Sequence, residues 1–491
     1  MVSLTAAWLA CLFAVVLANS MTKPPGRDEQ MYCTAGALVA KGMLPYRDFS
    51  YAAQLPYHPF LLAGIYRLIG TSHYLLAGRL FSVACDMIVV ILLVAWYGRI
   101  SRVGGLVLGL AAGTIYVIHP VVCYANGYAW NHDLVQAAVA AALFMVLSTE
   151  GSGTQAILRP MCAGLLLGLA VFSRITTILV LPVFIIWLLS DRSTPFRTRL
   201  VGMLLFAAGL TASAALPVWV IMQAPGAVWL ELVEIPRLYG QWLGLLGMTL
   251  PRTRLALRCL LLPENLLILG ILVLSGIWMW RSSLRQWICL ALAMVFCIVA
   301  FIPPTMWLQY WAIPVPFMLM GLAEPVSRLA DKRPALRVLA WVLTLGLLIR
   351  NWDQVDAVRS LVVPDQWVPI RVHWQYSQLL ADIGPGGRVL TIAPLWALEA
   401  DRQIYRELSC GPIIYRIADQ LTEDQRRLAN VVGPGSLRSL ILDKPPDAVL
   451  VGVEDPRFAF LETPLLSAVG PNWSSRSTAD GATVWFASNR P

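Results

Sequence analysis

The sequence predicts a polytopic α-helical membrane protein of about 11 transmembrane helices with a C-terminal external α/β domain. Three observations lead to this fold class. Of the 491 residues, 58% are hydrophobic and only 13% are charged, against about 25% charged residues in soluble domains. Apolar runs of helical length recur through residues 1–350. Residues 351–491 have the composition of a water-soluble domain, with 13 basic and 16 acidic residues.

The apolar runs number eleven, and several are shorter than the usual span of about 20 residues. Two neighbouring short runs, 160–173 and 175–190, are typical of a short hairpin. No basic residue precedes the first run, so we interpret it as a retained helix and not as a cleaved signal peptide. The runs cover residues 4–18, 75–97, 103–119, 133–148, 160–173, 175–190, 200–222, 264–280, 286–302, 307–323 and 337–350.

Basic residues are concentrated in the segments that lie on one side of the predicted membrane spans. Residues 1–350 contain 24 Lys and Arg against 12 Asp and Glu, and 12 of the basic residues fall in five short segments between alternate runs. Cytoplasmic loops are enriched in Lys and Arg. We therefore expect an inner (plasma) membrane protein with a cytoplasmic N-terminus, an external C-terminal domain and no nucleic-acid partner. The twelve are Arg99, Arg102, Arg159, Arg192, Arg197, Arg199, Arg281, Arg285, Arg328, Lys332, Arg333 and Arg337.

The external segments include a long first loop, residues 19–74, and a second segment, residues 223–263. Within the first loop, 28–42 and 54–69 are predicted to be short amphipathic helices at the membrane surface, each stopped by a glycine. The second segment carries the tryptophans and arginines typical of a membrane interface.

The C-terminal domain alternates predicted strands with predicted helices. The GPGG sequence at 384–387 precedes a strand, which favours a turn over a phosphate-binding loop. The predicted strands cover 388–393, 448–453 and 483–487, and the predicted helices cover 374–383 and 423–431.

Two external acidic positions are candidates for catalysis. Asp28 and Glu29 come soon after the first span, and Asp133 follows His132 at the external end of the fourth span. A carboxylate at the membrane surface can act as a general base. Carboxylates at helix starts also complement the helix dipole, and position alone does not separate these interpretations.

Three arginines, Arg79, Arg174 and Arg350, lie at the external edge of predicted spans. Snorkelling to the lipid headgroups is the favoured interpretation for Arg350. For Arg79 and Arg174 an anionic ligand competes with snorkelling, because a guanidinium group matches the geometry of phosphate.

The five histidines all fall on the predicted external side or at its edge. A metal site formed by His132, Asp133 or the first-loop acids is the weaker hypothesis, because no ligand spacing such as HExxH is present. We therefore predict no metal ligands and no definite cofactor, although a divalent metal is compatible with the sequence.

Several distinct short motifs lie within residues 1–350. The first loop and the start of the second span contain Asp28-Glu29-x-x-Tyr32, Gly42-x-x-Pro45-Tyr46-x-Asp48-Phe49 and Gly78-Arg79-Leu80. Farther along lie Asn131-His132-Asp133, Ser173-Arg174 and Gln309-Tyr310-Trp311-x-x-Pro314. Together they resemble the GT-C superfamily. The similarity is greatest to the branch of lipid A aminoarabinose transferases, protein O-mannosyltransferases and lipopolysaccharide-core galacturonosyltransferases.

The resemblance implies a GT-C-like catalytic domain in residues 1–350 and an inverting glycosyltransferase, of the hexosyl- or pentosyltransferase kind, that acts on the external face of the membrane. Its donor would be a polyprenyl-phosphate-linked sugar. Its acceptor would be lipid A or lipopolysaccharide core, a wall glycan or a protein of the cell envelope. The implied catalytic residues are Asp28, Glu29 and Asp133, and the implied substrate-binding residues are Tyr32, Tyr46, Arg79, His132, Arg174 and Tyr310.

The main alternative is a multi-pass transporter or lipid flippase. Asp86, inside the second span, would then be the functional intramembrane charge. Such proteins usually contain internal repeats, and the sequence has no convincing one. A polysaccharide polymerase or ligase would rely on external arginines and a histidine, and a non-catalytic scaffold would need none of these residues.

Overall fold

The computed structural model describes residues 2–147, 154–190, 195–248, 251–278, 284–384 and 386–487. It contains two compact units, each assembled from separate stretches of the chain. The first comprises Met1–Thr22, Leu80–Ala215 and Leu250–Val362, and the second comprises Lys23–Arg79, Leu216–Thr249 and Val363–Pro491. This grouping differs from the predicted division into 1–350 and 351–491, because the first external loop and Leu216–Thr249 pack with the C-terminal domain.

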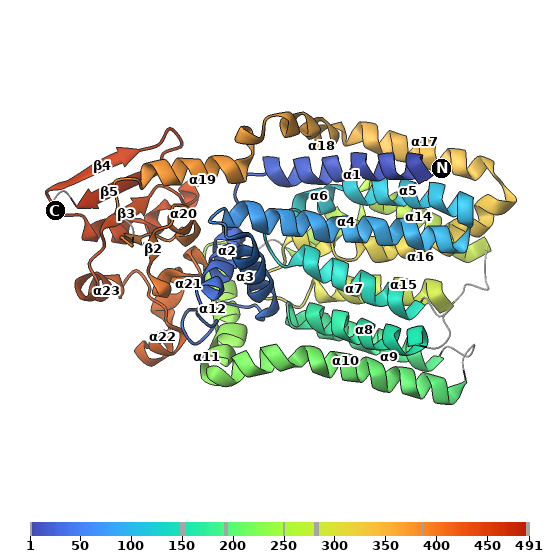
Figure 1. The fold of residues 1–491 in the computed structure, drawn as a ribbon, viewed down its shortest axis with the longest axis horizontal. Helices are drawn as coiled ribbons and strands as arrows, with labels where there is room; N and C mark the ends of the chain where they lie inside the picture. Colours follow the sequence, from blue (N-terminus) through green and yellow to red (C-terminus); the bar gives the residue numbers. More distant parts are fainter. Residues whose placement is uncertain are drawn as a thin grey trace. The chain divides into compact units, whose positions relative to one another are not determined.

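The first unit is helical, and its long helices run side by side (Figure 1). Each of the eleven predicted apolar runs overlaps one of its helices. The helices are α1 (Val2–Thr22), α4 (Tyr74–Ile100, beginning in the second unit), α5 (Arg102–Ile118), α6 (Pro120–Ala125), α7 (His132–Leu147), α8 (Thr154–Val171), η1 (Ile175–Val180), α9 (Leu181–Ser190), α10 (Phe196–Gln223, ending in the second unit), α13 (Arg252–Leu260), α14 (Pro263–Trp278), α15 (Leu284–Val299), η3 (Leu308–Trp311), α16 (Val315–Lys332), α17 (Ala335–Arg350), α18 (Trp352–Asp356) and η4 (Ala357–Val362).

Three helices of the described part of the chain have the length and hydropathy of a membrane span. Within the described residues, Ser3–Thr22, Tyr74–Ile100 and Phe196–Gln223 are long and apolar enough to cross a bilayer. Two bent helix pairs raise the number to five, with bends of 71° between α13 and α14 and 77° between α17 and the α18–η4 segment. The α10 side chains Leu204, Trp219 and Met222 are exposed, as expected of a helix that faces lipid. The protein is thus a helical membrane protein, and the total of eleven spans stays a prediction.

The tenth predicted run, 307–323, differs most from the structure. Its first residues form the short helix η3, and α16 begins only at Val315 and continues to Lys332. Pro314 and Pro316 lie at the start of α16, where their missing N–H groups cost no intrahelical hydrogen bond. Two of the arginines predicted to be cytoplasmic, Arg192 and Arg281, lie outside the described residues.

The second unit begins with the two predicted first-loop helices, α2 (Arg27–Ala40) and α3 (Tyr57–Ile69). Both end as predicted, because Gly42 and Gly70 have φ angles of 88° and 65°, a conformation that glycine adopts without strain. The prediction of an amphipathic surface helix is wrong for α2, whose residues from Glu29 to Val39 are all buried. It packs so closely on α3 that a Cβ at Gly36 would lie 2.8 Å from the Leu62 side chain.

The remaining helices of this unit are short. They are α11 (Pro225–Trp229), η2 (Leu230–Glu234), α12 (Ile235–Leu245), η5 (Pro364–Gln366), α19 (Val368–Leu379), α20 (Pro394–Glu399), η6 (Arg406–Leu408), α21 (Pro412–Tyr415), η7 (Ala418–Gln420), α22 (Glu423–Ala429), α23 (Leu437–Asp443), η8 (Pro456–Leu461) and η9 (Thr463–Ala468). Both helices predicted in the C-terminal domain are present, as α19 and α22, although α19 begins and ends several residues earlier than expected.

A five-stranded sheet forms the centre of the C-terminal domain. The three predicted strands are confirmed, and two shorter or more polar strands are added. Strands β2, β1 and β3 are parallel, and β5 runs antiparallel to β3 and β4. The strands are β1 (Arg388–Leu390), β2 (Gln403–Ile404), β3 (Ala448–Val451), β4 (Trp473–Ser477) and β5 (Thr483–Ala487), in the order β2-β1-β3-β5-β4. As predicted, the GPGG sequence turns into β1, with Gly387 N–H donating to Gly384 O at 3.0 Å; its Pro385 lies outside the described residues.

Candidate active site

Glu29, the second acid of the first-loop pair, is fully buried and engaged by Arg79. Arg79 Nε donates to Glu29 Oε1 at 2.9 Å, and Arg79 Nη2 donates to Glu29 Oε2 at 2.8 Å. Glu29 Oε2 also accepts the Gly26 N–H at 2.7 Å. Arg79, itself fully buried, donates to the carbonyls of Lys23 and Pro24 at 2.9 and 3.2 Å. The structure therefore brings these two predicted site residues together as a pair that fixes the chain before α2 to the start of α4.

Asp28 has a different environment although it precedes Glu29 directly. Its side chain is half-buried, and burial raises its pKa to about 6, with a smaller upward contribution from Glu29. The charges of Arg416 and Arg27 oppose this rise. A carboxyl group with this pKa is mostly ionised at neutral pH and can still take up a proton, which is the property required of a general base.

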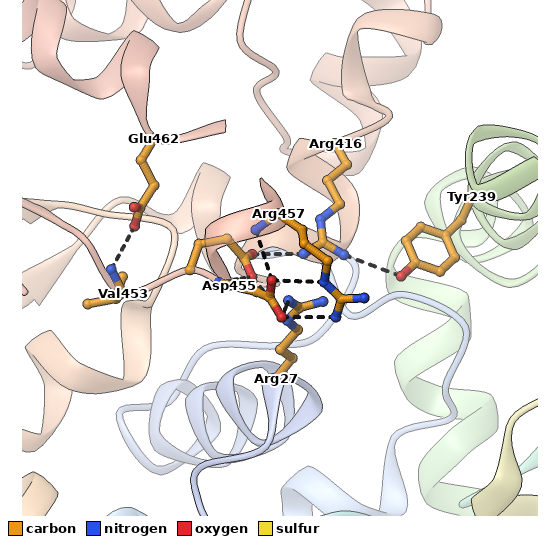
Figure 2. Close-up of polar contacts among 8 residues, drawn as sticks. Arg27, Tyr239, Arg416, Val453, Asp455, Arg457 and Glu462 are labelled. Atoms are coloured by element: carbon orange, nitrogen blue, oxygen red, sulfur yellow. Dashed lines mark hydrogen bonds and ion pairs between the residues drawn. The ribbon is translucent and has the colours of Figure 1, made fainter. Parts of the chain in front are cut away.

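The two arginines near Asp28 belong to an ion-pair network at the start of α2 (Figure 2). Arg416 Nη2 lies 2.7 Å from Glu454 Oε2, and Arg27 Nε lies 3.0 Å from Glu454 Oε1. Arg27 also pairs with Asp455 at 3.1 Å. Arg416 Nη1 donates to the Tyr239 hydroxyl at 3.3 Å, and its guanidinium lies 4.5 Å from the ring centre of Phe458.

This network was absent from the sequence predictions. Arg416 and Glu454 come from the C-terminal domain and Tyr239 from α12, and none of them lies in a recognisable motif. The buried Nε of Arg416 has no hydrogen-bond acceptor among the described residues. Arg416 is thus a nearly buried cation that acts electrostatically on Asp28.

Tyr32 and Tyr46, both predicted to bind substrate, lie in the aromatic interior of the first loop. Tyr32 is 3% exposed, and its ring meets those of Tyr51 and His58 edge-on, with centroid distances of 6.0 and 5.1 Å. Tyr46 is fully buried, has a φ of 68°, and donates its hydroxyl to the carbonyl of Gln54. Both side chains hold the shape of the loop that carries Asp28, and their contact with substrate stays a prediction.

Glu231 is a buried carboxyl group that the sequence did not single out. Its Oε2 accepts the Tyr51 N–H at 2.6 Å, and its own carbonyl accepts the Ala53 N–H at 2.9 Å. Burial raises the pKa of Glu231 to about 8. The two hydrogen bonds of Glu231 hold the 51–53 turn of the first loop. Glu231 lies in η2, a single π-helical turn, which is a local geometry common at functional sites.

A cavity of about 270 Å³ adjoins the start of α2 within the second unit. Arg27 and Gln30 of α2 line it together with Glu454. Tyr376 and Trp396 also line it, and their rings stack at 5.3 Å with an 8° angle. The volume is close to the lower end of ligand pockets, roughly 300 Å³, and the lining combines aromatic rings with hydrogen-bonding groups.

The first unit holds a second polar cluster, formed by His132, Arg174 and Tyr310. Arg174 Nη1 donates to His132 Nδ1 at 2.7 Å. The Arg174 guanidinium lies 4.4 Å from the ring centre of Tyr310, and the His132 and Tyr310 rings are 5.9 Å apart. Three residues predicted from three separate motifs thus meet. Among the residues that the structure describes, no carboxylate forms an ion pair with Arg174.

Asp133 lies beside this cluster in sequence but has its own contacts. It is fully buried in the first turn of α7, and its Oδ2 accepts the Gly127 N–H at 2.9 Å. Nearby, Asn131 donates to the carbonyl of Ser173 at 2.9 Å, which joins the start of α7 to the residue before Arg174. These contacts stabilise the loop that presents His132, and the catalytic role of Asp133 stays a prediction.

Asp86, the residue on which the transporter alternative depends, is held in a buried hydrogen-bond network. Its Oδ1 accepts the side-chain amide of Asn126, which also donates to Gln136 Oε1. The Tyr116 hydroxyl lies 2.9 Å from Asp86 Oδ1 and 2.7 Å from Gln136 Oε1, and its single proton serves one of the two. Hydrogen bonds between polar side chains of this kind join neighbouring helices, which favours a structural role for Asp86.

No family model matches the chain, and no curated protein matches it significantly by sequence. Solved structures, however, share its fold. ArnT from Cupriavidus metallidurans in the apo state superposes with a TM-score of 0.62 at 14% identity, over 99% of this chain and 97% of ArnT. The TM-score is 0.60 for the same protein bound to undecaprenyl phosphate.

Two further solved structures extend the comparison. The archaeal oligosaccharyltransferase AglB from Archaeoglobus fulgidus, in complex with an inhibitory peptide and a dolichol-phosphate, gives a TM-score of 0.55 at 11% identity, over 99% of this chain and 74% of AglB. The arabinofuranosyltransferase AftD from Mycobacteria gives 0.52 at 15% identity, over 99% of this chain and 41% of AftD. The chain therefore has the GT-C fold, and the resemblance carried by its motifs is confirmed at the level of the fold.

Proposed function

We propose that the protein is an inverting glycosyltransferase that moves a sugar from a polyprenyl-phosphate-linked donor to an acceptor of the cell envelope. One observation carries the proposal: Asp28 is a half-buried carboxyl group with a pKa of about 6, held beside Arg27 and Arg416 in a fold shared with ArnT and AglB. Solved structures of these two proteins contain undecaprenyl phosphate, in ArnT, and a dolichol-phosphate, in AglB, which supports a lipid-phosphate donor here.

The proposed reaction uses Asp28 as the general base. Its carboxylate takes the proton of an acceptor hydroxyl while the hydroxyl oxygen forms a bond to the anomeric carbon. The bond between that carbon and the phosphate oxygen breaks, and the electron pair leaves with the polyprenyl phosphate. The anomeric configuration is inverted because attack and departure occur on opposite faces of the sugar.

The leaving phosphate needs a cation, and we assign this role to Arg174. A guanidinium group can bind phosphate through two parallel hydrogen bonds, and the contacts of Arg174 among the described residues are with His132 and Tyr310 and not with a carboxylate. Arg79 is less suited, because Glu29 and two backbone carbonyls occupy its donors. We therefore assign positioning roles to Glu29 and Arg79.

The acceptor hydroxyl is proposed to enter from the cavity beside Arg27. The rings of Tyr376 and Trp396, 6% and 5% exposed, reach the wall of this cavity, and polar and charged groups of Arg27, Gln30 and Glu454 line it as well. This supports a carbohydrate-bearing acceptor such as lipid A, lipopolysaccharide core or a wall glycan over a peptide.

A divalent ion at the first-loop acids is not part of the proposal. Both oxygens of Glu29 accept hydrogen bonds from Arg79, so Asp28 and Glu29 do not present a pair of carboxylates to a metal. The basic segments between alternate helices support the orientation proposed for the chain, in which the N-terminus is cytoplasmic and the C-terminal domain lies outside the inner membrane.

The proposal is tested in the host cell. The gene is deleted and complemented with wild type or Asp28→Asn, and intact masses of envelope glycolipids and glycoproteins are compared. We expect one species to lose a single sugar mass in the deletion strain and to regain it only with wild type. Restoration by both forms would contradict the role of Asp28. Accumulation of lipid-linked sugar on one side of the membrane, with no species losing a sugar, would favour a transporter.

A further inference from the structure

A second set of chemically reactive side chains lies within the second unit, outside the proposed site. His73 comes directly before α4, His373 lies in α19 and Glu399 ends α20. One ligand atom from each of the three lies within 4.8 Å of the other two. In the described part of the chain this is the one group of three metal-ligating side chains, and it includes neither His132 nor Asp133.

The three side chains of this group contact one another directly. His373 Nδ1 lies 2.8 Å from Glu399 Oε2, and the rings of His73 and His373 stack with centroids 3.5 Å apart. The side chain of Glu399 is fully buried. His73 Nδ1 is also buried and has no hydrogen-bond partner among the described residues, an arrangement that costs free energy unless something occupies it.

The carboxylate is oriented by the backbone behind it. Glu399 Oε1 accepts the Leu75 N–H at 2.7 Å in the first turn of α4, which leaves Oε2 directed toward the imidazoles. Metal-binding carboxylates are commonly held by such second hydrogen bonds. Glu399 could serve solely as a cap for α4, but a cap explains neither the stacked imidazoles nor the buried nitrogen of His73.

We propose that His73, His373 and Glu399 bind a divalent transition-metal ion, with Zn²⁺ as the best fit. Two imidazole nitrogens and one carboxylate oxygen are a common zinc donor set, at bond lengths of about 2.0–2.2 Å. Mg²⁺ and Ca²⁺ prefer all-oxygen sites. The ligands come from positions 73, 373 and 399 of the chain, so the ion joins the start of α4 to the C-terminal domain. Water would complete the tetrahedral shell of the ion, and the proposed binding is independent of the proposed transfer reaction.

The test uses full-length, tag-free protein in detergent, stripped with a chelator and then equilibrated with Zn²⁺ or Co²⁺. We expect wild type to retain about one ion per chain after desalting, to show the visible absorption of Co²⁺ bound by nitrogen and oxygen ligands, and to gain thermal stability with Zn²⁺. We expect His73→Ala, His373→Ala and Glu399→Gln to bind at least about tenfold more weakly and to lose the zinc-dependent gain.

Two control variants separate metal binding from general damage. Trp374→Phe changes the exposed neighbour of His373 on the same helix, and Glu423→Gln removes an exposed carboxylate of the same domain; both should bind Zn²⁺ like wild type. Glu399→Gln keeps an acceptor for Leu75 and therefore should fold. The proposal is overturned if wild type retains no more Zn²⁺ than the His73→Ala/His373→Ala double variant, or if the controls lose as much binding as the ligand variants.

Discussion

The polar cluster around Asp28 in the second unit and the cluster around Arg174 in the first differ in how their charges are balanced. Near Asp28, Arg27 and Arg416 both pair with Glu454, at 3.0 and 2.7 Å. Arg174 instead contacts the uncharged Tyr310 ring and the acceptor nitrogen of His132. A balanced network can adjust the pKa of one carboxyl group, whereas a guanidinium without a carboxylate partner keeps its attraction for an anion. The first cluster therefore suits a carboxyl group that exchanges a proton, and the second suits an anionic ligand.

The largest expected effect comes from Asp28→Asn, which removes the proton acceptor and preserves the size of the side chain. We expect the rate of sugar transfer in membranes of the deletion strain to fall ~10²–10⁴-fold. The matched control is Asp48→Asn, another first-loop acid, whose carboxylate pairs with Arg47 at the surface. Near-normal transfer by Asp28→Asn would show that no base is needed at this position. An equal loss in the control would show that the effect is not specific to Asp28.

Arg174→Gln should have the next largest effect, because it removes the cation assigned to the leaving phosphate. We expect kcat to fall ~10²–10³-fold, the usual cost of losing one group that stabilises transition-state charge. Arg237→Gln is the control, since Arg237 of α12 is an exposed arginine that pairs with Glu234 at the end of η2. Equal losses of activity in Arg174→Gln and Arg237→Gln would contradict a specific role for Arg174 in transfer.

The buried Glu29–Arg79 pair should affect stability more than chemistry. Glu29→Gln leaves the Arg79 charge buried without a carboxylate, a change that costs about 3–5 kcal/mol in other proteins. We expect a markedly lower thermal midpoint for Glu29→Gln, and a smaller loss for Glu29→Gln/Arg79→Met than the sum of the single variants. The exposed pair of Glu423 and Arg427 gives the comparison, and Glu423→Gln should unfold like wild type. Additive losses in the double variant would mean that the two side chains act independently.

The pH dependence of transfer should report the pKa of Asp28, which burial raises to about 6. Below that pH the base becomes protonated, and kcat/KM should fall about tenfold per pH unit. Because the folded pKa lies above the usual value of 3.8, the stability contributed by Asp28 is present at low pH and is lost as the pH rises through about 6. Asp28→Asn should therefore be more stable than wild type above pH 6, and transfer that stays constant down to pH 4 would contradict the assignment.

The smallest effect is expected at Tyr310. Its ring faces the Arg174 guanidinium at 4.4 Å, and such a contact contributes about 0.5–2 kcal/mol. Tyr310→Leu should raise KM for the donor by several-fold, and Tyr310→Phe, which keeps the ring, should behave like wild type. A loss of activity in Tyr310→Phe as large as that in Tyr310→Leu would assign a role to the hydroxyl and not to the ring.

Local patterns in the sequence were enough to predict most of the elements. The apolar runs correspond to helices, the first-loop helices end at their glycines, and the three hydrophobic strands of the C-terminal domain are present. These features depend on residues close together in the chain. The start of α16 was misplaced because a continuous apolar composition masked the effect of Pro314 and Pro316, and β4 was missed because its residues are mostly polar and exposed.

The candidate site could be predicted only in part. His132, Arg174 and Tyr310 were identified from separate motifs, but their mutual contacts were not visible in any of them. Asp28 and Glu29 looked equivalent in the sequence. The structure distinguishes them, because Glu29 meets Arg79 while Asp28 lies within the influence of Arg416, almost four hundred residues away in the chain.

The sequence by itself determined that this chain is a helical membrane protein with an acidic pair after its first helix, because composition and periodicity act locally. Only the tertiary structure decided which acid is paired and which has the pKa of a base, because burial and ion pairing arise when distant segments pack. The same holds for His73, His373 and Glu399, which are unremarkable in the sequence and come within 4.8 Å of one another only in the folded protein.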